Sequence, residues 1–120
     1  AEGKKGLRKH ATPEKFKVFT AQQVQKLKST VRKIRIVPTI NPDQKKIKDL
    51  LVKGLDYQIE GVQMHGRCFA MKDKGLSQAC MTKGEKEIYP KMQNSFRAYG
   101  NAVDAYRRKQ GIPVDSTPSP

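Results

Sequence analysis

The spacing of apolar residues predicts an all-α fold, an antiparallel helical hairpin plus one shorter basic amphipathic helix, with extended N- and C-terminal tails. Apolar side chains recur every three or four residues in three separate segments, as they do along one face of a helix. Glycine and proline residues break the pattern between these segments. Because the chain has only 120 residues, of which 36% are hydrophobic, it has room for one small domain.

The first helix is predicted over residues 20–35. Thr20 has the character of an N-cap, and Gln23 stands at the capping-box position three residues later. The glycines and the proline of residues 1–19 interrupt any periodicity, so this segment is predicted to be a basic extended arm. The helix itself is expected to be amphipathic and basic, with a narrow apolar stripe formed by Val24, Leu27, Val31 and Ile34.

The second helix is predicted over residues 42–72, with Asn41 as the N-cap and Pro42 at the first helical position. Small residues recur along one seam of this helix at intervals of seven. A glycine inside a helix costs about 1 kcal/mol relative to alanine, and close approach of two backbones commonly offsets that cost. Another helix is therefore expected to pack tightly against the seam, which contains Gly54, Gly61 and Cys68.

The third helix is predicted over residues 86–109, where the periodicity is the strongest in the chain. Pro90 must lie in its first turn or kink it. A short separate helical turn is expected before it, at residues 77–81, because Gly84 interrupts the pattern. The helical domain therefore covers residues 20–110, and residues 111–120 form a tail that contains Pro and Ser.

The strongest indication of function is the charge. Lys and Arg number 25 against 11 Asp and Glu, a net charge of +14, and the N-terminal third carries most of the excess. Such a surface repels itself and favours a polyanionic partner, and RNA is the expected one because cations that bind phosphates release counterions. The candidate residues for contacts with the RNA backbone are Lys4, Lys5, Arg8, Lys9, Lys15, Lys17, Lys26, Lys28, Arg32, Lys33, Arg35, Arg107, Arg108 and Lys109.

Aromatic residues lie among these cations at two places. Phe16 and Phe19 alternate with lysines near the N-terminus, and Tyr99 and Tyr106 precede a basic cluster near residue 108. Aromatic rings beside cations are typical of surfaces that stack nucleic-acid bases. The two tyrosines also belong to the apolar stripe of the third helix, which favours a place in the core.

The two cysteines and two histidines match no catalytic or metal motif. Cys68 and Cys80 have no neighbouring ligands that could complete a zinc site, so no metal is expected. They either form a disulfide across a turn or are two small buried residues. His10 and His65 are expected at a surface or an interface. The sequence therefore predicts no enzyme, no cofactor and no small-molecule substrate.

The resulting hypothesis is a non-enzymatic structural subunit of a ribonucleoprotein, such as a small ribosomal or organellar-ribosomal accessory protein, with other subunits as partners. The alternative is an accessory assembly subunit docked on an acidic protein complex or filament, mitochondrial or cytoskeletal, without nucleic acid. Its protein interface would be the apolar flank Leu55, Val62 and Phe69. Peripheral membrane attachment through residues 20–35 ranks last, because the stripe lacks Trp and Phe.

The expected location is intracellular, in the cytoplasm or the mitochondrion. No apolar run reaches the roughly 18 residues of a membrane-spanning helix, so an integral membrane protein is not expected. Residues 1–40 contain no apolar segment typical of a secretory signal, which argues against secretion.

Overall fold

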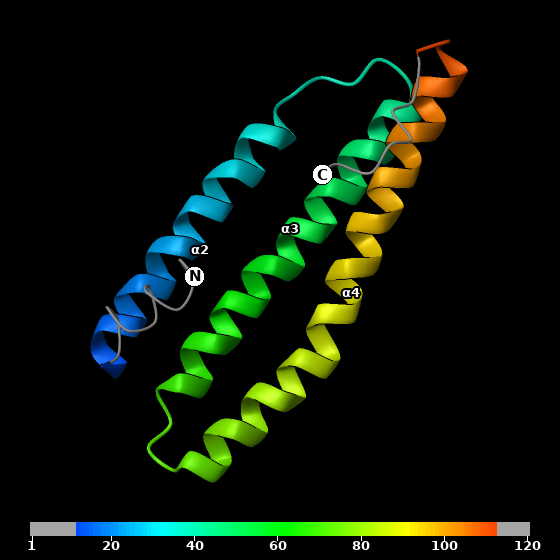
Figure 1. Cartoon of the computed structure of the whole chain (residues 1–120). Helices are drawn as coiled ribbons and strands as arrows, with labels where there is room; N and C mark the ends of the chain where they lie inside the picture. The colour runs from blue at the N-terminus through cyan, green and yellow to red at the C-terminus, as the bar shows by residue number, and fades with distance from the viewer. Residues whose placement is uncertain (1–11, 113–120) are drawn as a thin grey trace.

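Three long helices make up the computed structural model, which describes residues 12–112 (Figure 1). They are α2 (Pro13–Arg35), α3 (Pro42–Phe69) and α4 (Lys74–Lys109). The described part contains no strand, which confirms the predicted all-α fold. None of its helices is long and apolar enough to cross a membrane. The predicted terminal tails lie outside the described residues, apart from a few at their inner ends.

Helix α3 lies between the other two helices and packs against both, whereas α2 and α4 make little contact with each other (Figure 1). Helices α3 and α4 run antiparallel, as the predicted hairpin requires, and α2 is the shorter helix beside them. The molecule is elongated, measuring 55 × 31 × 25 Å. Each outer helix therefore has one face against α3 and a wide face toward solvent.

The predicted extended arm is wrong for residues 13–19, because α2 begins at Pro13, seven residues earlier than expected. Proline suits the first helical position, where no N–H is needed, so Pro13 starts the helix here rather than interrupting it. The Thr12 side chain caps the helix by accepting a hydrogen bond from the Lys15 N–H at 3.2 Å. Phe16 and Thr20 are both buried, so they extend the buried stripe of this helix by about two turns beyond Val24.

Helix α4 also begins earlier than predicted, at Lys74 rather than near residue 86. The Asp73 carboxylate caps it by accepting from the Leu76 N–H at 2.9 Å. The expected separate turn at residues 77–81 is instead the start of this helix. Gly84 does not interrupt it, because the Met64 side chain occupies the space where a Cβ would project. Pro90 lies in the middle of the helix, and α3 ends at Phe69 rather than at residue 72.

The small-residue seam of α3 faces α4, as predicted. A Cβ on Gly54 would lie 2.6 Å from the Phe96 ring, and one on Gly61 would lie 3.7 Å from Ile88. Two apolar clusters complete the core. One joins α2 to α3 through Val24, Val31 and Ile59, and the other joins α3 to α4 through Met64, Cys68 and Ile88.

Candidate functional site

Helix α2 is the most basic element of the described chain. Its 23 residues include seven cations and a single acid, Glu14. Only Arg35 has an acidic partner among residues 12–112, the Asp56 carboxylate at 3.6 Å. The concentration of unpaired charge on one helix gives its surface a positive potential. All seven cations are exposed: Lys15, Lys17, Lys26, Lys28, Arg32, Lys33 and Arg35.

The spacing of six of these seven cations arranges them in two rows along α2, and Arg32 lies outside both rows. One row is Lys15, Lys26 and Lys33, and the other is Lys17, Lys28 and Arg35. Within each row the intervals are eleven and seven residues, which are close to three and two full helical turns. Since a residue in α-helix rises about 1.5 Å, each row is roughly 27 Å long. An extended polyanion that lies parallel to the helix can therefore contact several cations of one row.

Two members of the second row, Lys17 and Lys28, border a groove between α2 and α3 with a volume of about 760 Å³. Its charged lining residues are Lys17, Lys28 and Arg67, and no Asp or Glu among residues 12–112 lines it. The side-chain amides of Gln25 and Gln63 add hydrogen-bonding groups. The groove therefore offers three positive charges and two amides to a ligand.

Close packing of the two helices forms the floor of this basic groove. Thr20 is buried, and its hydroxyl donates to the Lys17 carbonyl at 3.1 Å. A Cβ on Gly66 would lie 2.8 Å from the Thr20 Oγ1, so glycine allows the close approach of α3 to α2. Val24 and Ala70 supply the apolar part of the floor. Lys17 and Lys28 stay on one side and Arg67 on the other because this packing fixes the helices.

Arg67 is the residue that sequence reasoning missed. It lies on α3, far along the chain from Lys17 and Lys28, and only the packing of α2 on α3 places it on the same groove. No local pattern around Arg67 distinguishes it from the other exposed cations. A prediction of the register between the two helices would have been needed to find it.

The basic cluster at the end of α4 lies away from this groove. The Tyr106 hydroxyl accepts from the Gln44 Nε2 at 3.0 Å, which places the end of α4 beside the start of α3. The groove instead lies near the end of α3. In the cluster Lys109 forms an ion pair with Asp43 at 3.0 Å, and Arg107 and Arg108 are exposed. The remaining four candidates, Lys4, Lys5, Arg8 and Lys9, lie outside the described residues.

The aromatic residues expected to stack on bases are used within the fold. Phe16 is buried, and its ring centroid lies 4.3 Å from that of Phe69. Phe19 and Tyr99 are partly buried. Tyr106 is also partly buried, with its hydroxyl engaged by Gln44. The basic surface therefore presents cations and amides, and these aromatic rings are not displayed beside them.

The apolar flank expected to dock on a partner protein is covered by α2 of the same chain. Leu55 and Val62 pack against the cluster that contains Val24 and Val31. Phe69 packs against Phe16. The prediction of a protein interface at these three positions is therefore corrected, because the extra N-terminal turns of α2 and its apolar stripe occupy the flank.

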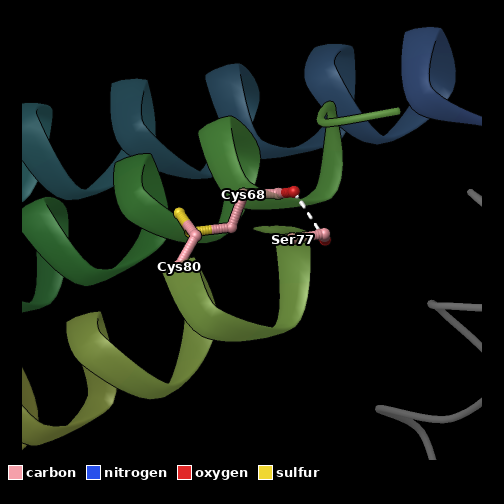
Figure 2. Close-up of a disulfide and its surroundings, with 3 residues drawn as sticks. All are labelled: Cys68, Ser77 and Cys80. Atoms are coloured by element: carbon pink, nitrogen blue, oxygen red, sulfur yellow. Dashed lines mark hydrogen bonds between the residues drawn. A yellow bond between two sulfur atoms is a disulfide. The ribbon is translucent and has the colours of Figure 1, made fainter. Parts of the chain in front are cut away.

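Cys68 and Cys80 form a disulfide, with their sulfur atoms 1.90 Å apart and their Cα atoms 5.5 Å apart (Figure 2). The Ser77 hydroxyl donates to the Cys68 carbonyl at 2.7 Å and adds a second link across the turn. Both contacts join the end of α3 to the start of α4. Because Arg67 directly precedes Cys68, the disulfide also fixes the backbone at one side of the groove.

Away from the basic groove, the ionisable groups of the described residues include one close pair of a histidine and a tyrosine. No cluster of His, Cys, Asp and Glu that could hold a metal is found within residues 12–112. His65 Nε2 lies 2.8 Å from the Tyr89 hydroxyl. Burial, together with the nearby Glu85 carboxylate, raises the pKa of Tyr89 above its usual value near 10. This pair joins α3 to α4.

Comparisons of the chain with protein-family models, curated protein sequences and solved structures found no match.

Proposed function

We propose that this protein is a non-enzymatic RNA-binding protein that holds the sugar-phosphate backbone along α2. The observation that carries the proposal is the set of cations on this helix that lack acidic partners in the described chain. Two of them, Lys17 and Lys28, share a groove with Arg67. A groove whose described lining contains cations and no acid suits a chain of phosphates.

Binding through cations alone has predictable properties. Each Lys or Arg that neutralises a phosphate releases condensed counterions, so affinity falls steeply as salt rises. Contacts with phosphates carry no sequence information. Since Phe16 is buried against Phe69, base stacking there does not contribute. The proposed binding is therefore tolerant of RNA sequence and strongly dependent on ionic strength.

A structural role in a ribonucleoprotein, such as a small ribosomal or organellar-ribosomal accessory protein, follows from this mode of binding. The long helices act as a rigid support that places positive charge against RNA. The alternative is docking on an acidic protein complex through the apolar flank. Two residues of that flank, Leu55 and Val62, pack against α2 of the same chain, so this alternative has less support.

The disulfide favours a second candidate ligand. Disulfides persist in oxidising compartments and are rare in the reducing cytosol. The Cys68–Cys80 bond is thus easier to reconcile with an oxidising location than with the cytoplasm. The polyanion expected outside cells is a sulfated polysaccharide, whose sulfates would occupy the same groove as phosphates.

One experiment separates these proposals. The tagged full chain is purified from its native source and sedimented before and after treatment with ribonuclease or with heparinase. Heavy particles that collapse with ribonuclease support the RNA proposal, and release by heparinase supports the polysaccharide. Particles that resist both enzymes contradict both proposals and leave docking on an acidic protein.

A further inference from the structure

Three large aliphatic side chains lie exposed in the loop that joins α2 to α3. Ile36 exposes 80% of its surface, Val37 55% and Ile40 85%. We refer to Ile36, Val37 and Ile40 as the aliphatic loop. Other exposed apolar side chains, such as Val18 and Leu76, are scattered singly, which is normal for a protein surface. Three in five consecutive residues form a local concentration, and such concentrations mark interaction sites.

Hydrogen bonds hold the backbone of the aliphatic loop in place. The N–H groups of Ile36 and Val37 donate to carbonyls in the last turn of α2, at 3.3 and 3.1 Å. The Ile40 N–H donates to the Gln44 Oε1 at 3.0 Å, and the Lys48 Nζ donates to the Val37 carbonyl at 2.7 Å. A polar backbone group without a partner is costly to move out of water. The three aliphatic side chains can therefore enter an apolar environment with their own N–H groups already paired.

Cations predominate around the aliphatic loop. Residues 32–49 contain six Lys or Arg and two Asp. The end of α4 lies beside the start of α3 through the contact of Tyr106 with Gln44, and it adds its basic cluster to the same end of the molecule. A second copy of the chain would bring like charges together at this end. The positive charge around the aliphatic loop therefore favours an anionic partner. Because the aliphatic side chains gain free energy only when they are buried, that partner should also offer an apolar interior.

We propose that the aliphatic loop inserts into the interfacial layer of an anionic lipid bilayer while the surrounding cations contact lipid head groups. Attraction of Lys and Arg to anionic lipid and burial of aliphatic side chains act together in such anchoring. This proposal goes beyond RNA binding. The aliphatic loop lies outside the basic groove, and the cations around it include Arg32, Lys33 and Arg35 at the end of α2. It differs from attachment through the apolar stripe of α2, which is not free because Val24 and Val31 are buried against α3.

The proposal is tested with the full chain and two kinds of vesicle, phosphatidylcholine alone or phosphatidylcholine with about 30 mol% phosphatidylserine. Binding is measured by sedimentation of the vesicles. The test variant is the double substitution Ile36→Asn and Ile40→Asn, which leaves the charge unchanged. The matched control is Val18→Asn with Leu76→Asn, which removes similar exposed apolar surface elsewhere. Circular dichroism verifies that both variants keep the helical content of the natural chain.

The natural chain is expected to bind the anionic vesicles and to bind neutral vesicles weakly. The loop variant should lose about tenfold or more in partition coefficient, since two aliphatic side chains no longer enter the bilayer. The partition coefficient of the control should stay within about twofold of that of the natural chain, because isolated exposed side chains do not contact the bilayer.

Equal binding by the loop variant and the control would contradict insertion of the aliphatic loop and leave only attraction by charge. Absence of binding to anionic vesicles would overturn the proposal entirely. RNA affinity of the loop variant is measured in parallel and should be unchanged.

Discussion

The ring of Phe96 lies directly against Gly54, so that a Cβ at this glycine would be 2.6 Å from the nearest ring atom. At this contact the backbone of α3 closely approaches a side chain of α4, the longest helix. It explains why α3 tolerates a glycine in its interior. The hairpin formed by α3 and α4 supports α2, and the groove depends on α2 lying in one register on α3.

The variant Gly54→Ala is expected to destabilise the protein by about 1–2 kcal/mol, because the Phe96 ring must move and overpacking outweighs the better helix propensity of alanine. Gly100→Ala is the matched control, since in the described part of the chain nothing beyond its own stretch of helix lies within 4 Å of its Cβ position. It should stabilise α4 by roughly 0.5–1 kcal/mol. Urea unfolding measures both values. Changes of the same sign in the two variants would contradict the close contact.

The early start of α2 is tested at Phe16, which is buried against Phe69. Phe16→Ala should lower the free energy of unfolding by about 3 kcal/mol, through loss of buried apolar area and creation of a cavity. The neighbouring Val18 is 57% exposed, and Val18→Ala should change stability by no more than about 0.5 kcal/mol. Chemical denaturation measures the free energy of unfolding of the two variants and of the natural chain. A neutral Phe16→Ala would mean that residues 13–19 form the extended arm after all.

Reduction of the Cys68–Cys80 disulfide should lower the free energy of unfolding by about 3 kcal/mol, because the bond closes a short loop and restricts the unfolded chain. Unfolding curves with and without a phosphine reductant measure the difference. The double variant Cys68→Ala with Cys80→Ala is the control and should not respond to the reductant. If the natural chain were equally insensitive, the disulfide would be absent in solution.

Alkaline pH should destabilise the protein through Tyr89. Its pKa is raised, by burial and then by Glu85, so the folded state favours the protonated phenol. The contribution of the protonated Tyr89 to the free energy of unfolding is fully present below the usual tyrosine pKa near 10. It is lost as the pH rises through the higher pKa of the folded state. Unfolding midpoints measured from about pH 9 to 12 should therefore fall less steeply in Tyr89→Phe. Identical slopes in the two proteins would contradict the assignment.

Local sequence patterns predicted the helices well and their ends less well. The periodic apolar residues of α3 and its Asn41 cap predicted that helix almost completely. The predicted helix starts are wrong at Pro13 and Gly84 for the same reason, because each residue interrupts a local pattern without ending the helix. Pro13 is compatible with a helix start, and Gly84 is compensated by Met64 from another helix. A contact between helices cannot be seen in a local pattern.

The candidate site was predictable on one helix only. The density of lysines on α2 was visible in the sequence, and these side chains are exposed as expected. Arg67 joins them only through the packing of α3 against Thr20 and Val24. The apolar flank around Val62 was misassigned to a partner, because an apolar helix face looks the same in sequence whether its own chain or another protein covers it.

Binding of single-stranded RNA by the full chain at several salt concentrations tests the central proposal most directly. The triple variant Lys17→Gln, Lys28→Gln and Arg67→Gln removes the groove cations. The control variant Lys74→Gln, Lys83→Gln and Lys86→Gln removes the same charge from exposed positions on α4. If the groove holds phosphates, the slope of log affinity against log salt should become shallower by about 2 in the groove variant and stay nearly unchanged in the control. Equal losses in the two variants, or an affinity of the natural chain that does not depend on salt, would contradict it.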